Sequence, residues 1–227
     1  MKTTYYGHSS FQIEGEGVNI LFDPFISPNE LAKDIDISKI NPELILVSHG
    51  HQDHVADLLP IQKQSNAQVL AIVETAAWVA RIGVDPSKII EMNFGGTYKF
   101  SFGKVKMVYA LHTNSTPDGQ YGGQPVGYVL NIGDKNIYFA GDTALTMEMS
   151  LLQDLYLDWA FLPIGGHYTM DVDDAIKAAK LINCKNIIGM HYNTFPPISI
   201  EGEQAKEKFK AQGMELHLLN VGESLNL

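Results

Sequence analysis

The stretch ILVSHGHQDHVADLL, residues 45–59, decides how the rest of the chain is interpreted. It begins as an apolar run of strand length and then places His49, His51, Asp53 and His54 within six positions. Three of the eight histidines of the chain therefore lie in one short loop. Residues two apart in an extended loop project to the same side, so His49 and His51 can reach one metal ion. Asp53 and His54 begin the next helix and face a neighbouring position.

The ligand types in this loop favour a catalytic metal site. Neutral imidazole and carboxylate groups suit zinc, manganese or iron, and a site without thiolates is compatible with an open coordination position. The N-terminus of the following helix favours an ionised Asp53. The alternative, a polar loop of surface histidines, would leave four ligand-type side chains without partners. We therefore expect metal binding here.

Composition and charge limit the class of protein. A chain of 227 residues can bury a sizeable core, and 45% hydrophobic with 19% charged residues is typical of soluble globular proteins. The formal charge of −10 argues against nucleic acid as a partner. No apolar run reaches the roughly 18 residues of a membrane span, and MKTTYYGHSSF lacks the apolar core of a signal peptide. We expect an acidic, cytoplasmic protein whose residues 1–227 form a single domain, with neither nucleic acid nor membrane as a partner.

Cys184 is the only cysteine of the chain. An internal disulfide and a site built from several thiolates are therefore excluded. Its neighbourhood, LINCKNIIGM, predicts a buried and inert thiol.

Apolar periodicity predicts an alternation of strands and helices. Two mixed β-sheets with helices on their outer faces satisfy this order, which makes the chain an α/β (α+β) protein. One long irregular segment, residues 112–127, predicts either an exposed loop or a flexible wall beside the site. The strands are expected at residues 3–14, 18–24, 43–50, 67–73, 97–102, 104–112, 126–133, 135–142, 157–166, 184–192 and 214–221, and the helices at 53–65 (interrupted or kinked by Pro60), 74–83, 144–156, 171–183 and 201–213.

Three further ligand-type residues stand where predicted strands end. MVYALH ends in His112, IYFAGD ends in Asp142 and NIIGMH ends in His191. An α/β framework places its sites at the carboxyl ends of its strands, so these three side chains are expected to join the loop. A hydrogen-bonded polar residue at a strand end explains each one singly but not the three together.

These motifs carry a resemblance to a known family. HGHQDH matches the H-x-H-x-D-H signature of the metallo-β-lactamase fold superfamily, and His112, Asp142 and His191 follow in that family's order. GHSSF, LFDPF and PIGGHYTM further resemble a branch of prokaryotic metal-dependent hydrolases similar to the ascorbate-6-phosphate lactonase group. The resemblance covers essentially the whole chain and implies a four-layer αβ/βα sandwich.

The resemblance also implies the ligands of two divalent ions, with zinc expected first, manganese next, and iron or nickel left open. It assigns His49, His51 and His112 to the first ion and Asp53, His54 and His191 to the second, with Asp142 bridging the pair. A water shared by two such ions becomes a hydroxide nucleophile near neutral pH. No side-chain nucleophile is then required.

Asp53, His8 and His167 are the candidate catalytic residues beyond simple coordination. His8 and His167 stand beside glycines at predicted strand ends, in YGHSS and GGHYT. Each is either a structural histidine or a pocket residue that acts as general acid or substrate contact. Asp23 in LFDPF is expected to support a metal ligand, and His217 is interpreted as structural.

Hydrolysis of an ester-like bond is the leading hypothesis for function, with a lactone or a phosphodiester as the small-molecule substrate and amides left open. One alternative is a mononuclear iron redox enzyme such as a dioxygenase. The diiron reductases resemble H-x-E-x-D at the loop, where this chain has His51, and they carry a flavin domain. A third hypothesis is a metal-binding protein with little catalytic activity. The resemblance suggests a homo-oligomer.

Overall fold

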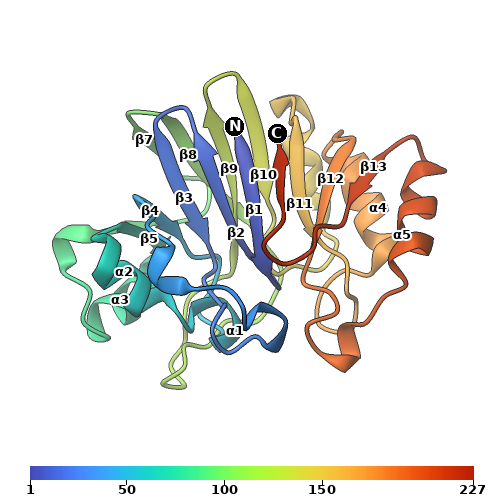
Figure 1. The fold of residues 1–227 in the computed structure, drawn as a ribbon. Helices are drawn as coiled ribbons and strands as arrows, with labels where there is room; N and C mark the ends of the chain where they lie inside the picture. Colours follow the sequence, from blue (N-terminus) through green and yellow to red (C-terminus); the bar gives the residue numbers. More distant parts are fainter.

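The computed structural model describes all 227 residues and contains two seven-stranded mixed β-sheets packed face to face (Figure 1). The first sheet has the spatial order β14 (Ser224–Asn226), β1 (Lys2–Gly7), β2 (Ser10–Gly15), β3 (Val18–Phe22), β4 (Leu44–Leu46), β5 (Gln68–Ile72), β6 (Ile89–Met92). The second has the order β13 (Glu215–His217), β12 (Asn186–Met190), β11 (Trp159–Pro163), β10 (Lys135–Phe139), β9 (Val126–Ile132), β8 (Gly103–Tyr109), β7 (Thr97–Phe100).

Helices lie on the outer faces of both sheets. Those on the left of Figure 1 pack on the first sheet and those on the right pack beside the second. The predicted fold, a sandwich of two mixed sheets between outer helices, is therefore confirmed. The α-helices are α1 (Gln52–Val55), α2 (Leu58–Ser65), α3 (Val73–Arg81), α4 (Val172–Leu181) and α5 (Gly202–Lys210), and the 3₁₀ segments are η1 (Glu30–Ala32), η2 (Ile37–Lys39), η3 (Pro86–Lys88), η4 (Met147–Leu155) and η5 (Pro196–Ile198).

The apolar run of β4 is continuous because both of its faces are buried. Leu44 and Leu46 belong to the core between the two sheets, whereas Ile45 and Val47 belong to a smaller apolar core under α2 and α3. Successive side chains of a strand point to opposite faces, so a strand between two apolar layers needs apolar residues at every position. Aromatic rings join the sheets across the core: Phe22 stacks on Phe139, and Phe11 meets Phe161 edge-to-face.

Strand direction brings the candidate ligands to one end of the sandwich. In the first sheet β1, β3 and β4 run the same way, and in the second sheet β8, β10 and β12 do so. The carboxyl ends of these six strands lie at the lower end in Figure 1, near α1. The predicted site residues follow the carboxyl ends of these strands: His8 follows β1, Asp23 follows β3, the HGHQDH loop follows β4, His112 follows β8, Asp142 follows β10 and His191 follows β12. The strand directions therefore bring residues that are far apart in the chain together in one site.

The first predicted strand, residues 3–14, is wrong as a single element. The chain reverses at Gly7 and His8, and β2 returns antiparallel to β1. Gly7 has φ +102° and His8 has φ +55°, which is the left-handed backbone that a tight reversal needs. An alternating apolar pattern continues through such a turn, so the pattern alone does not reveal it.

Other elements differ from the prediction in extent. In place of the single helix expected at 53–65, the structure has two helices, α1 and α2, separated at residues 56–57. Pro60 does not cause the break, because it lies in the first turn of α2, where proline is tolerated. In place of the α-helix expected at residues 144–156, the structure has the shorter 3₁₀ segment η4 at Met147–Leu155. The edge strands β6 and β14 were not predicted; they are three or four residues long and gain their order from pairing.

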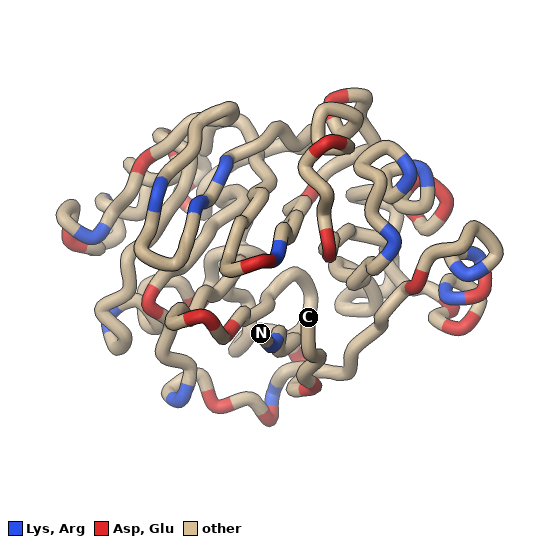
Figure 2. The backbone as a smooth tube through the Cα atoms, turned by 90° about the horizontal axis from the view of Figure 1, so that it is seen from above, with Lys and Arg blue, Asp and Glu red and all other residues tan.

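Charge is spread over the molecule. Lys and Arg positions lie interspersed with Asp and Glu (Figure 2), within a formal net charge of −10. None of the helices combines the length and the apolar character that crossing a bilayer requires.

Candidate metal centre

The loop that carries HGHQDH is held from both sheets. It follows β4, and α1 begins at Gln52, so that Asp53 lies in the first turn of this short helix. From β9 of the opposite sheet, the Val126 N–H donates to the carbonyl of Ser48 at 3.0 Å and the Tyr128 hydroxyl donates to the carbonyl of Val47 at 2.6 Å. The start of the loop is therefore fixed by the second sheet.

The first cluster contains His49, His51 and His112, with one ring nitrogen of each within 4.8 Å of the others. His49 Nε2 lies 2.9 Å from His51 Nδ1. His49 is fully buried, and burial lowers its pKa well below the usual value; burial also lowers the pKa values of His51 and His112. These imidazoles are therefore neutral, which is the form that coordinates a metal ion.

The second cluster contains His8, Asp53, His54 and His191, again within 4.8 Å of one another. His54 is fully buried and Asp53 half-buried. Asp53 has a lowered pKa: burial opposes ionisation, but the hydrogen bond from His8 and the charge of His54 outweigh it. The carboxylate is thus available as a ligand.

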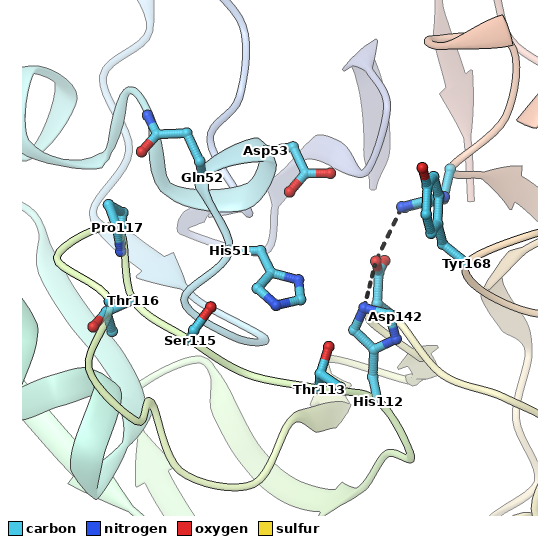
Figure 3. Close-up of a pocket in the computed structure, with 12 residues that line it drawn as sticks. His51, Gln52, Asp53, His112, Thr113, Ser115, Thr116, Pro117, Asp142 and Tyr168 are labelled. Carbon is cyan, nitrogen blue, oxygen red and sulfur yellow. Dashed lines mark ion pairs between the residues drawn. The ribbon is translucent and has the colours of Figure 1, made fainter. Parts of the chain in front are cut away.

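Asp142 lies between the two clusters. Its Oδ2 is 3.6 Å from His112 Nε2 of the first cluster, and 3.3 Å from His54 Nε2 and 3.0 Å from His191 Nε2 of the second. Figure 3 shows it beside His112 at the bottom of the pocket. Burial raises the pKa of Asp142, yet His191 and His54 hold it well below the ordinary value. One ionised carboxylate therefore faces both ligand sets.

Orphaned polar atoms show that these residues fit metal ions. Asp142 Oδ1 and His54 Nε2 are buried and have no hydrogen-bond partner in the protein. Leaving such atoms unsatisfied costs about 1–3 kcal/mol each, so native structures give them a partner. The nitrogen and carboxylate donor set is that of zinc and related divalent ions.

Asp23 supports the second cluster from behind. This fully buried carboxylate accepts hydrogen bonds from His54 Nδ1 at 2.8 Å, from the Ser48 N–H at 2.7 Å and from the Ser48 hydroxyl at 2.6 Å. The bond leaves His54 Nε2 directed at the site, as a carboxylate behind a metal-binding imidazole does. Burial opposes charge on His54, but Asp142 and Asp23 raise its pKa well above the usual value. The supporting role expected of Asp23 agrees with these contacts.

Three site residues have left-handed backbone conformations. The φ angles are +55° at His8, +40° at Asp23 and +54° at His191, and each residue directly follows a strand or its last glycine. Such conformations are uncommon for residues other than glycine and are held by the surrounding contacts. One of these contacts is the 2.8 Å hydrogen bond from the His191 N–H to the carbonyl of His8. The sharp turns aim the side chains across the end of the sandwich.

The structure places His8 and His167 differently. His8 is fully buried in the second cluster, where its Nε2 lies 3.2 Å from Asp53 Oδ2 and its Nδ1 lies 3.0 Å from the Thr194 hydroxyl. Burial lowers its pKa to about 4. His167 is exposed, and its ring packs edge-to-face against Tyr168 at 4.5 Å. A catalytic role for either residue stays a prediction, and only His8 lies among the clustered ligands.

A cavity of about 630 Å³ opens onto the two clusters (Figure 3). Residues 112–119, the first part of the irregular segment 112–127, form one of its walls. This position agrees with the expectation of a wall beside the site, and the flexibility of the segment stays a prediction. The lining residues are His51, Gln52, Asp53, His112, Thr113, Ser115, Thr116, Pro117, Gly119, Asp142, Tyr168 and His191.

Sequence reasoning missed Asn114, which fastens the cavity wall. Its Oδ1 accepts from the Gly50 N–H at 2.8 Å and its Nδ2 donates to the carbonyl of Gly122 at 2.7 Å. A Cβ at Gly50 would lie 2.8 Å from Thr116 Cγ2, so glycine is required there. The sequence signal for Gly50 was its place inside HGHQDH, whereas nothing in the sequence singled out Asn114.

The residues left outside the site behave as expected. Cys184 is buried, and burial raises the pKa of its thiol to about 11, so the thiol is protonated and unreactive. His217 packs against the ring of Trp159 at 5.1 Å on β13, at the edge of the second sheet.

The sequence of this chain is similar to those of known proteins. Residues 2–191 match the family model described as "Beta-lactamase superfamily domain". A UPF0173 metal-dependent hydrolase of Methylacidiphilum infernorum is 46% identical over 228 residues, covering 100% of both chains. One from Thermus thermophilus is 41% identical, covering 100% of this chain and 99% of the relative.

A solved structure agrees with the sequence relatives. Igni18, a metallo hydrolase from the hyperthermophilic archaeon Ignicoccus hospitalis, superposes with a TM-score of 0.88 at 35% identity. The match covers 99% of this chain and 97% of Igni18.

Proposed function

The chain belongs to the beta-lactamase superfamily and within it to the UPF0173 metal-dependent hydrolases, and from this premise we propose that it uses two divalent metal ions to hydrolyse an ester-like bond. The proposed substrate is a small molecule that contains a lactone or a phosphodiester. The proposed ions are zinc in the first instance and manganese in the second. His49, His51 and His112 would hold one ion, and Asp53, His54 and His191 the other.

The position of Asp142 is the observation that carries this proposal. Its Oδ2 lies within 3.6 Å of an imidazole nitrogen from each cluster, so one carboxylate can serve both ions. A mononuclear site would need only one of the clusters. The shared carboxylate therefore favours a hydrolase with two metal ions over a redox enzyme with a single iron.

Two ions bound here would supply an activated water as nucleophile and would polarise the carbonyl or phosphoryl oxygen of the substrate. The protein contributes the geometry. Asp23 holds His54 and the Ser48 backbone in place, and Asp142 remains ionised at the base of the cavity. His8 orients the Asp53 carboxylate through a hydrogen bond of 3.2 Å between its Nε2 and Asp53 Oδ2. A preorganised arrangement of this kind lowers the barrier because little rearrangement accompanies the reaction.

The test is turnover by the metal-reconstituted protein. We expect two zinc or manganese ions per chain by elemental analysis, and hydrolysis of generic lactones or of bis-p-nitrophenyl phosphate. His51→Ala removes a ligand from the exposed side of the first cluster and should lower kcat by at least about a hundredfold while the circular dichroism spectrum is retained. His217→Ala is the matched control, because it removes an imidazole from β13 that belongs to neither cluster and does not line the cavity, and it should leave kcat unchanged.

Three outcomes would contradict the proposal. Undiminished turnover by His51→Ala would remove the first cluster from catalysis. One iron per chain with oxygen-dependent activity would favour the redox alternative. Two bound ions without hydrolysis of any ester would favour a metal-binding protein in which the ions hold the loops together.

The proposed setting is the cytoplasm, and the proposed assembly is a homo-oligomer. The single cysteine, buried and unpaired, supports a reducing compartment. Exposed apolar side chains on η4, with Met147 at 71% and Leu151 at 78% exposure, support contact with a second copy. Nucleic acid and membrane are not proposed as partners.

A further inference from the structure

The cavity wall opposite α1 presents hydroxyl groups to the two clusters. Residues 113–116 are extended, and their burial alternates: Asn114 and Thr116 are buried, whereas Thr113 and Ser115 are exposed in the cavity. Figure 3 shows the hydroxyls of Thr113 and Ser115 directed toward the space beside His51 and His112. Alternation in an extended chain therefore gives one face to the fold and the other to a ligand.

The two faces of this segment have separate tasks. Asn114 and Thr116 hold the loop, since they bond to Gly50, Gly122 and Gln120. Thr113 and Ser115 are not needed for that purpose. A hydroxyl that can donate and accept is suited to recognise hydroxyl groups of a substrate.

Tyr168 forms the facing wall. Its side chain is exposed, at 55%, and lines the cavity on the side away from Thr116 and Pro117 (Figure 3). His167 packs edge-to-face against its ring with the planes at 87°. An aromatic ring that stands at the mouth of a polar cavity offers a flat apolar surface for the face of a ring-shaped substrate.

The turn that carries Tyr168 is tied to the metal-binding strands. The Met170 N–H donates to the carbonyl of Thr143, next to Asp142, at 3.1 Å, and the Gly166 N–H donates to the carbonyl of Met170 at 2.9 Å. A Cβ at Gly165 would lie 2.2 Å from the carbonyl oxygen of His191. The distance from Tyr168 to the two clusters is therefore set by the fold.

Beyond the two clusters, where the ions themselves would supply positive charge, the cavity offers a ligand no cationic side chain. Its ionisable lining consists of imidazoles and of the carboxylates Asp53 and Asp142, with neither Lys nor Arg among the lining residues. A phosphate group placed beyond the clusters would meet hydroxyls and an aromatic ring but no cation, within a chain of net charge −10. Recognition of phosphate in proteins relies on Arg, Lys or helix N-termini.

We propose that the substrate is a neutral lactone that carries several hydroxyl groups, with its ring face against Tyr168 and its hydroxyls bonded to Thr113 and Ser115. This inference rests on the proposed function and selects one of its two substrate classes. Tyr168 is the specificity-determining residue, and His167 is a positioning residue that acts through it.

The test is a binding measurement that does not depend on turnover. Calorimetry on the zinc-loaded protein compares D-gluconolactam, a stable analogue of a hydroxylated lactone, with its 6-phosphate. The neutral lactam should bind at least about tenfold more tightly, equivalent to about 1.4 kcal/mol. Tyr168→Ala should weaken lactam binding by about tenfold, and Tyr168→Phe, which keeps the ring, should bind as the unchanged protein does.

Further variants separate the contributions. Tyr98→Ala removes a tyrosine from β7, outside the cavity, and should leave binding unchanged. Thr113→Val and Ser115→Ala should each weaken binding by about fivefold, the effect of one lost hydrogen bond. His167→Ala should weaken binding less than Tyr168→Ala does, since the ring itself remains.

The outcomes distinguish this inference from the proposed function. Tighter binding of the 6-phosphate, unchanged binding by Tyr168→Ala, or no lactam binding would overturn the inference, whether or not other esters are hydrolysed. Lactam binding as expected without turnover of gluconolactone or any other ester would support the recognition inference and overturn the proposed hydrolysis.

Discussion

Within the second cluster, His8 contacts Asp53 through one ring nitrogen and Thr194 through the other. Its ring lies 4.1 Å from that of His191, and Phe25 and Phe195 close around it at 5.6 and 5.4 Å. Thr194 and Asp53 occupy its two nitrogens. A neutral imidazole in this position orients the Asp53 carboxylate, so the residue is better placed to position a ligand than to donate a proton.

At the residue scale we predict that His8→Ala lowers kcat by about 10- to 100-fold, the usual effect of removing a group that orients a metal ligand. Both metal ions should remain, because the ligands assigned to them are intact. Steady-state kinetics together with elemental analysis measures the two effects. Thr194→Val serves as the milder comparison, since it removes only the outer partner of His8. Loss of one ion from His8→Ala would instead make His8 a ligand.

β9 connects the second sheet to the metal loop of the first. Tyr128 and Tyr138 are both fully buried tyrosines on neighbouring strands, but their hydroxyls differ. The Tyr128 hydroxyl donates to Val47 at the start of the loop, whereas the Tyr138 hydroxyl has no hydrogen-bond partner. Of these two buried tyrosines, only Tyr128 on β9 therefore holds the loop through its hydroxyl.

At the element scale we predict opposite results for two matched substitutions. Tyr128→Phe leaves the buried Val47 carbonyl without its donor and should lower the free energy of unfolding by about 1–3 kcal/mol. Tyr138→Phe removes an unsatisfied buried hydroxyl and should leave the stability unchanged or raise it. Urea unfolding followed by circular dichroism measures both. Equal destabilisation by the two substitutions would show that the loop does not depend on β9.

The whole molecule is closed at one end by groups from both sheets. His8, Asp53 and His54 come from the first sheet and its loops, whereas His112, Asp142 and His191 follow strands of the second. Ions bound among them would join the two sheets at this end of the sandwich. A ligand that binds only the native state stabilises it by mass action.

At the scale of the whole molecule we predict that removing the metal ions lowers Tm. Each ion present at a hundred times its Kd contributes about 2.7 kcal/mol, which corresponds to roughly 5–10 °C per ion for a chain of this size. Differential scanning calorimetry before and after dialysis against EDTA measures the shift, and added zinc should reverse it. Asp142→Asn, which removes the shared carboxylate, should show a smaller shift. An unchanged Tm after metal removal would mean that the ions do not join the sheets.

Local sequence identified the candidate ligands and the order of most elements. His49, His51, Asp53 and His54 are near neighbours along the chain, and the apolar runs before His112, Asp142 and His191 mark the strand ends that bring them in. Such patterns are visible because spacing and alternation are properties of consecutive residues.

Only the tertiary structure decided what supports and shapes the site. The contacts of Tyr128 with Val47, of Asn114 with Gly50 and of His8 with Asp53 join residues tens of positions apart, and the reversal at Gly7 and His8 lies inside an unbroken strand pattern. The placement of Tyr168 in the cavity and of His167 outside it depends on a turn tied to two strands. A single sequence records each of these residues without its partner, because contacts across two sheets are made by folding and leave no local spacing to detect.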